Sequence, residues 1–255
     1  MSRAGDVAIV HRRSVRLDGQ TWTALSFRPS ETVRFATNYF HETWHILGGV
    51  ETARLPGRVC WAMACQRVER TMFVIERSHL VPNPFDADPS STIVIVNSDL
   101  GTPNRQARIA LKRHVPWATP SEGRLTLRSH GPDQVGDHRS LRDLDERSGE
   151  SFFAERQRRW VNRIDGLLIL AAPATVLREW GMTLTGLGQR WYNGSAATEL
   201  DWPVKDGEVQ VFRDFDERVS AAIVARRRLF PGHEHAELNA DERQQVRSLG
   251  AAQRE

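Results

Sequence analysis

The chain of 255 residues contains little cysteine, little lysine and no long apolar segment. Its two cysteines, Cys60 and Cys65, are too few for a zinc ribbon, and we interpret both as reduced packing residues. The longest apolar run, residues 166–176, is far too short to span a bilayer. Residues 1–20 carry charges and no apolar leader segment, so we expect a cytoplasmic protein with no membrane partner.

The basic character of the chain comes almost entirely from arginine, because Lys112 and Lys205 are its only lysines. The net charge is only +3, and the arginines are scattered along the chain. No helix-turn-helix, zinc finger or aromatic stacking motif accompanies them, so we expect no specific nucleic-acid partner. The one dense cluster, residues 226–228, suits a solvated helix face equally well. Apolar residues make up 40% and charged residues 26%, the balance of a globular protein.

The hydrophobic pattern predicts strands and helices that interleave within one α+β unit. Strands are predicted at residues 8–10, 15–17, 21–27, 59–65, 71–75, 93–96, 124–127 and 167–170. Helices are predicted over residues 30–49, 105–114, 151–161 and 215–230, and strand-and-turn structure over residues 180–202. Residues 131–149 are polar and lack periodicity, and residues 233–255 form a polar tail that we expect to be disordered and dispensable for folding.

The most informative motif, His41-Glu42-Thr43-Trp44-His45, lies inside the first predicted helix. That helix would begin at the N-cap Ser30 and end at Gly48-Gly49. Apolar residues recur in it at helical spacing: Val33, Ala36, Phe40, Trp44 and Leu47. On a helix, His41 and His45 would lie one turn apart and could hold a zinc ion, with Glu42 as the base of a zincin-type peptidase.

A second motif, RLTLRSHGPDQVGDHRSLRDLD, occupies residues 124–145. Together with the segment Glu42-Thr43-x-x-Ile46-Leu47-x-Gly49, it resembles the active-site motifs of JAB/MPN (JAMM-type) metalloproteases. In that family a strand ends in His-x-His-Pro, and a serine and an aspartate follow. The resemblance implies that Glu42 is the catalytic base and that Ser140 stabilises the oxyanion. It also implies that His130 and Asp143 bind zinc.

The chain departs from the family pattern at the first histidine, where it has Arg128. Arginine keeps its proton at physiological pH and has no lone pair to donate to zinc. The spacing is also one residue longer than usual, with Gly131 as the extra residue. A hydrolytic zinc site needs three protein ligands, so we expect His45 to be the third ligand, with His138 as an alternative.

The order of the predicted elements also resembles the JAB/MPN core over roughly residues 15–232. The most similar proteins are bacterial JAB domains that accompany ThiF-type, ubiquitin-activating-like partners and carry a segment resembling residues 215–232. The expected fold is therefore an α+β, JAB/MPN-like mixed sheet flanked by helices. Residues 1–212 would form this domain, residues 213–232 a C-terminal amphipathic helix and residues 233–255 the tail.

The resemblance implies a zinc-dependent metalloprotease or isopeptidase, acting on a peptide or isopeptide bond, for example that of a ubiquitin-like protein. The alternative is a catalytically degenerate JAB/MPN scaffold that binds a ubiquitin-like or ThiF-type partner. The zincin-type peptidase using His41 and His45 is the third possibility. Each site residue also has a structural interpretation: Glu42 as a polar residue on a helix, Ser140 as an N-cap and Asp143 as a carboxylate complementing a helix dipole.

Overall fold

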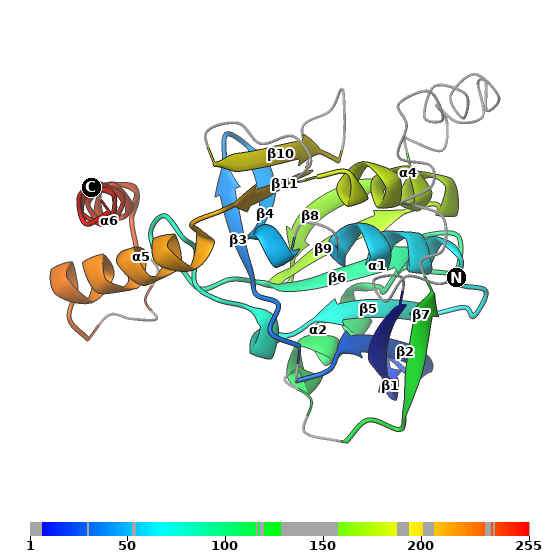
Figure 1. Cartoon of the computed structure of the whole chain (residues 1–255). Coiled ribbons are helices and arrows are strands. Elements are labelled where there is room, and N and C mark those ends of the chain that lie inside the picture. Colours follow the sequence, from blue (N-terminus) through cyan, green and yellow to red (C-terminus); the bar gives the residue numbers. More distant parts are fainter. Residues whose placement is uncertain are drawn as a thin grey trace.

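Strands rich in β-branched and aromatic residues form a seven-stranded mixed sheet (Figure 1) with the order β7-β1-β2-β5-β6-β9-β8. Its strands are β1 (Val7–Leu17), β2 (Gln20–Phe27), β5 (Thr71–Ile75), β6 (Thr92–Asn97), β7 (Gly123–Arg128), β8 (Trp160–Ile164) and β9 (Leu167–Ala172). The pairs β2–β5 and β6–β9 are parallel, and the other neighbours are antiparallel. This computed structural model describes residues 7–29, 31–52, 55–115, 117, 120–128, 158–187, 194–200, 207–232, 236 and 238–254.

A second, smaller mixed sheet has the order β10-β11-β4-β3. Its strands are β3 (Phe35–Phe40), β4 (Thr43–Gly49), β10 (Ser195–Glu199) and β11 (Gly207–Phe212). β3 and β4 form an antiparallel hairpin, and β4 also pairs with β11 in parallel. β3 is consequently an edge strand, and one end of its outer side pairs with Leu80 through an isolated bridge at Phe35.

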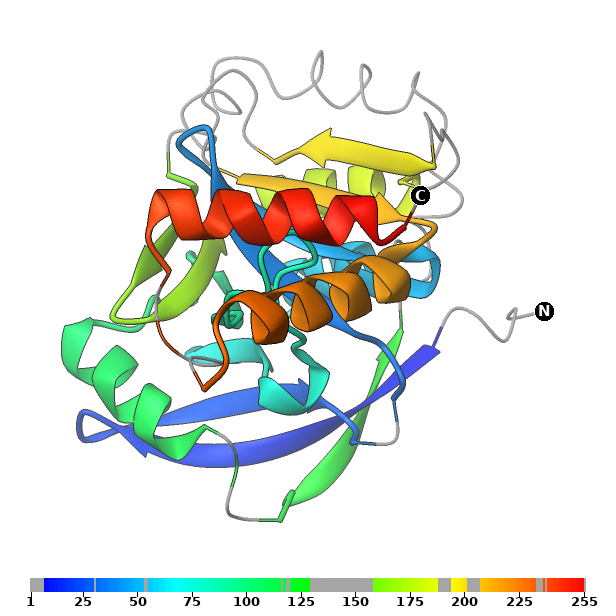
Figure 2. The same cartoon turned by 90° about the vertical axis from the view of Figure 1, so that its left-hand side faces the viewer.

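Five α-helices in the described residues cover the two sheets: α1 (Leu55–Ala64), α2 (Arg105–His114), α4 (Ala174–Thr185), α5 (Phe215–Leu229) and α6 (Ala240–Ala252). Two short 3-10 helices, η1 (Val50–Thr52) and η2 (Arg77–His79), complete the set. α1 and α4 pack closely at Gly57, where a side chain would not fit: a Cβ there would lie 2.7 Å from the backbone nitrogen of Thr185. Figure 2 shows α5 and α6 side by side over the small sheet.

The buried side chains form separate clusters on the faces of the sheets. The largest joins one face of the large sheet to α1, α4 and the inner face of the small sheet. A second cluster lies between the other face of the large sheet and α2. Phe215 and Val219 of α5 pack on Ala36, Leu47 and Phe212 of the small sheet. The result is a single mixed α/β domain that includes both C-terminal helices.

Much of the predicted element pattern is confirmed. The strand predicted at residues 71–75 and the helix predicted at residues 105–114 match β5 and α2 in both bounds. The strands predicted at residues 21–27, 93–96, 124–127 and 167–170 and the helix at 215–230 each lie within two residues of an observed element. The strands predicted at residues 8–10 and 15–17 belong to the single long strand β1.

Three predictions are wrong, and a fourth is wrong in part. The helix predicted over residues 30–49 is the β3–β4 hairpin, and the strand predicted at residues 59–65 lies in α1. The strand-and-turn structure predicted over residues 180–202 is wrong at its start, where α4 continues to Thr185, and right at β10. The tail expected to be disordered contains α6, which begins with a capping box of Asn239 and Glu242 and buries Val246. Of the helix predicted at residues 151–161, residues 160–161 belong to β8, and residues 151–157 lie outside the described chain.

No helix in the described part of the chain is long and apolar enough to cross a membrane.

Candidate binding cleft

The motif His41-Glu42-Thr43-Trp44-His45 forms the turn and the first half of β4. Phe40 and Thr43 are the last pair of the hairpin, and His41 and Glu42 make the two-residue turn between them. Their φ angles are 50° and 63°, in the left-handed region that a two-residue hairpin turn of type I′ requires. His41 and His45 therefore do not lie one helical turn apart, and the zincin-type arrangement on a helix is overturned.

His45 is buried within the small sheet and faces a carboxylate. It pairs in register with Asn38 on one side and Glu208 on the other, and its Nε2 lies 3.8 Å from a carboxylate oxygen of Glu208. Burial lowers the pKa of His45, Glu208 opposes this shift and His41 adds to it, so the imidazole is neutral at neutral pH. The surroundings of His45 are thus those of a buried histidine held within a sheet.

A cleft of about 440 Å³ opens beside the edge strand β3. Four parts of the chain form its walls: the β3–β4 hairpin, the loop of residues 81–91, β8 and α6. The lining residues are Thr37, Asn38, Tyr39, Trp44, Asn83, Asp86, Asp88, Pro89, Ser91, Arg163, Arg243 and Arg247. Its volume falls within the range of roughly 300–1,000 Å³ that is typical of ligand pockets.

Hydrogen bonds fix the loop of residues 81–91 against β3. The backbone N–H of Thr37 donates to the Ser90 hydroxyl at 2.9 Å, and the N–H of Ser91 donates to the Thr37 hydroxyl at 2.9 Å. The amide of Asn83 donates to the Asn38 side-chain oxygen at 2.8 Å. This side of the cleft is therefore arranged before any ligand binds.

Two aspartates of the loop hold arginines from the C-terminal helices. Asp88 accepts hydrogen bonds at 2.7 Å from Arg226 and from Arg243, and Asp86 accepts one at 2.7 Å from Arg247. Asp86 is only 1% exposed, so its charge depends on Arg247 for compensation. The positive charges of Arg243 and Arg247 are consequently compensated by carboxylates of the same protein.

Arg163 on β8 differs from the other two arginines of the cleft. Its guanidinium lies 6.0 Å from the centre of the Trp44 ring, in a cation–π contact. Among the residues that the structure describes, no carboxylate forms an ion pair with it. On the same tryptophan, the centre of the Tyr39 ring lies 4.8 Å from the centre of the Trp44 ring, and Tyr39 is 54% exposed. A cationic and aromatic surface thus faces solvent at this point.

Of the predicted zinc site, the structure describes only Glu42 and His45. Glu42 is exposed in the turn, and His45 faces Glu208. Within the described ranges, no group of three or more His, Cys, Asp or Glu side chains is arranged to hold a metal ion. His130, Ser140 and Asp143 lie outside the described residues. The described residues alone therefore do not fit zinc.

Sequence reasoning missed the residues that form the cleft. Trp44 and Arg163 are far apart in the chain, and the contact of β4 with β8, an edge strand of the large sheet, brings them together. The loop of residues 81–91 is rich in proline, aspartate and serine. This composition predicts a loop, but it does not predict that the loop lines a cleft. The usable signal was the concentration of aromatic residues in the hairpin: Phe35, Tyr39, Phe40 and Trp44.

Comparison with protein-family models, curated proteins and solved structures finds no match for this chain. The resemblance to JAB/MPN proteases therefore rests on the motifs and their order alone.

Proposed function

We propose that this protein binds a partner protein, and that the cleft beside β3 receives an extended segment of that partner ending in a carboxylate. The observation that carries the proposal is Arg163, a cation held over Trp44 with no carboxylate partner among the described residues. A guanidinium binds a carboxylate through two parallel hydrogen bonds, so a chain terminus suits this position.

The composition and place of the cleft support a protein partner. Tyrosine, tryptophan and arginine dominate the binding energy of protein interfaces, and Tyr39, Trp44 and Arg163 lie together here. Phe40 adds a further aromatic side chain that is 43% exposed and has Arg247 over its ring. The loop of residues 81–91 already occupies part of the outer side of β3, so the partner's segment would lie over the aromatic surface rather than add a strand.

A direct test uses a fluorescent glycine-rich hexapeptide with a free C-terminal carboxylate and the same peptide with a C-terminal amide. We expect the free acid to bind and the amide to bind about tenfold more weakly, because one charge-assisted pair is lost. Arg163→Ala should abolish the preference for the acid. Arg16→Ala is the control, since Arg16 is an exposed strand arginine elsewhere. Equal binding of acid and amide would refute the proposal.

In this proposal the chain is a JAB/MPN-like scaffold, and its partner is a ubiquitin-like protein. A cationic cleft at a sheet edge suits the extended C-terminal tail of such a protein better than the broad surface of a ThiF-type partner. The mixed sheet flanked by helices agrees with a JAB/MPN-like fold, but the hairpin in place of the helix before Glu42 does not.

Zinc-dependent hydrolysis is the second candidate. It is favoured by the turn at His41 and Glu42, because two successive non-glycine residues with positive φ are uncommon and such strain concentrates at functional sites. Metal analysis of the purified protein tests it. Zinc near one atom per chain, lost in both His130→Ala and Asp143→Ala, would support hydrolysis. A protein that takes up no zinc would exclude it.

A further inference from the structure

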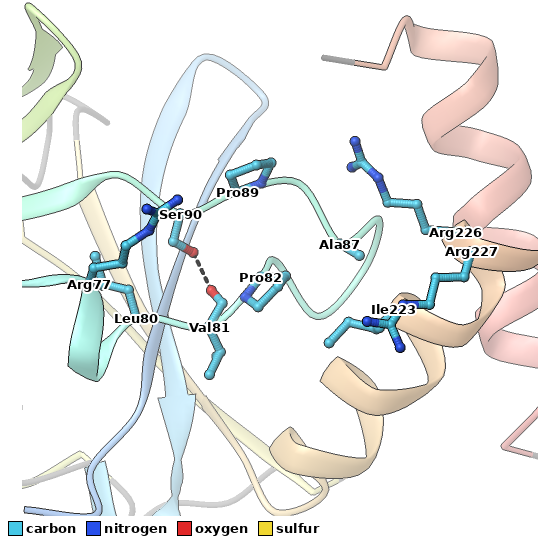
Figure 3. Close-up of a pocket in the computed structure, with 10 residues that line it drawn as sticks. All are labelled: Arg77, Leu80, Val81, Pro82, Ala87, Pro89, Ser90, Ile223, Arg226 and Arg227. Atoms are coloured by element: carbon cyan, nitrogen blue, oxygen red, sulfur yellow. Dashed lines mark hydrogen bonds between the residues drawn. The ribbon is translucent and has the colours of Figure 1, made fainter. Parts of the chain in front are cut away.

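A second cavity, of about 240 Å³, lies on the other side of the loop of residues 81–91 (Figure 3). The loop forms one wall, η2 forms another, and Ile223 and Arg227 of α5 form the third. Its volume is just below the range of roughly 300–1,000 Å³ that is typical of drug-sized ligands. The cavity therefore suits a small ligand or the end of a larger one.

The lining combines an apolar interior with cationic groups. Leu80, Val81, Pro82, Pro89 and Ile223 supply the apolar surface. Arg226 also lines the cavity, but its guanidinium binds Asp88. The exposed side chain of Arg77 leaves positive charge at the rim.

Hydrogen bonds hold the walls of the cavity in place. The hydroxyl of Ser90 donates to the carbonyl of Val81 at 2.6 Å, as the dashed line in Figure 3 marks. The N–H of Val81 donates to the carbonyl of Phe35 at 2.8 Å, and the N–H of Ala87 donates to the carbonyl of Asn83 at 2.8 Å. Pro82 and Pro89 further restrict the loop. A ligand would therefore meet a preformed site and would lose little affinity to ordering it.

Arg77 is the group that selects the charge of the ligand. It begins η2, whose backbone is closed by the bond from His79 N–H to the Glu76 carbonyl. No carboxylate of the described residues forms an ion pair with its side chain. An arginine at the mouth of an apolar cavity favours an anion whose remainder is apolar, because the tail is buried while the charge stays at the solvated rim.

We propose that this cavity is a binding site for a small aliphatic carboxylate, with the hydrocarbon against Val81, Pro82 and Ile223 and the carboxylate on Arg77. The same chemistry occurs in a free short-chain acid and in the C-terminal residue of a peptide ending in leucine or valine. The site is separate from the cleft beside β3, and its occupation does not depend on the function proposed there.

The test is calorimetric titration of the full chain with octanoate and with N-acetyl-leucine, which represent the two sources, and with octanol as the uncharged control. We expect at least one of the two acids to bind and octanol to bind about tenfold more weakly, the loss that follows removal of one charge-assisted hydrogen bond. Binding of octanoate alone assigns the free acid, and binding of N-acetyl-leucine alone assigns the peptide terminus.

Two matched pairs of variants test whether the ligand binds in this cavity. Arg77→Glu should weaken binding of the acid by at least about tenfold, whereas Arg105→Glu, at an exposed arginine of α2, should not change it. Ile223→Glu puts a like charge in the cavity and should have the same effect as Arg77→Glu. Its neighbour Val224 is 52% exposed, so Val224→Glu should bind normally. Failure of both acids to bind, equal binding of octanol, or unchanged binding in Arg77→Glu would each overturn the proposal.

Discussion

At the scale of single residues, the turn at His41 and Glu42 is the place where local preference and observed conformation disagree most. Both residues have positive φ, a conformation that costs roughly 1–2 kcal/mol for a residue with a Cβ. Asparagine followed by glycine is the pair that suits this turn best. The sequence His-Glu therefore carries strain that a purely structural turn does not need.

The double variant His41→Asn/Glu42→Gly should be more stable than the natural chain. We expect the free energy of unfolding to rise by about 1 kcal/mol, since relief of left-handed strain outweighs the added chain entropy of glycine. The urea midpoint, at an unchanged slope, measures this. The variant also separates the two proposed functions, because it removes the carboxylate that hydrolysis needs and leaves Arg163 and Trp44 in place. A lower midpoint would mean that the two side chains make stabilising contacts.

His45 should make stability depend on pH. Burial lowers its pKa in the folded protein, and Glu208 only partly opposes this. The unfolded chain therefore takes up a proton first, at about pH 6.5, so the free energy of unfolding falls as the pH drops below that value and levels off below the folded pKa.

The variant His45→Gln should show a smaller loss of stability between pH 7 and pH 5 than the natural chain. The slope will not vanish, because the pKa values of His11 and His79 are also lowered by burial. Chemical denaturation at several pH values measures the slope. An unchanged slope in His45→Gln would show that Glu208 compensates the charged ring fully.

At the scale of elements, the helix predicted over residues 30–49 failed because β4 is buried on both faces. It lies inside the small sheet, between α5 on one side and the main core on the other, so the neighbours Ile46 and Leu47 are both apolar and the polar–apolar alternation stops there. Apolar positions three and four apart then imitate a helix. The turn also lacks the Asn-Gly pair that is the strongest sequence signal of a hairpin. The β-branched and aromatic content of residues 35–46 was the better guide to a strand.

Attachment of α6 through the loop aspartates predicts unequal roles for two arginines of the same helix. Arg247 pairs with Asp86, which is 1% exposed, whereas Arg254 pairs with Asp214, which is 42% exposed. Arg247→Ala should lower the free energy of unfolding by about 3 kcal/mol, because it leaves a buried carboxylate without a partner. Arg254→Ala should cost less than about 1 kcal/mol. Equal losses in thermal or urea unfolding would contradict this account of the interface.

At the scale of the whole molecule, the large sheet was easier to predict than the site. Several of its strands are short apolar runs bounded by turns, so local sequence predicts them, as β5 and β9 show. The cleft instead depends on which elements meet. Asn38, Asp86, Arg163 and Arg247 converge because the hairpin, the loop, β8 and α6 pack together. No local pattern encodes such packing, and the ligand set of His130 and Asp143 stays a prediction.

Packing of α6 on the rest of the domain reverses the expectation that residues 233–255 are dispensable. Val246 is fully buried and Leu238 is 4% exposed, and both belong to one hydrophobic cluster with Ala225 of α5. A chain ending at Gly232 would lose these contacts and the pairing of Asp86 with Arg247. We expect its free energy of unfolding to fall by about 3–5 kcal/mol.

The same truncation should also remove binding at the cleft, because Arg243 and Arg247 form its wall. A chain ending at Ala252 is the control, since it keeps α6 whole and loses only the exposed Arg254–Asp214 pair, so it should lie within about 1 kcal/mol of the full chain in stability and match it in peptide binding. The experiment compares urea unfolding, and binding of the glycine-rich hexapeptide with a free C-terminal carboxylate, in the three chains. If the chain ending at Gly232 kept its full stability, α6 would not be part of the folded core. If it bound the peptide as well as the full chain, Arg163 and the hairpin would be a sufficient binding surface without the C-terminal helix.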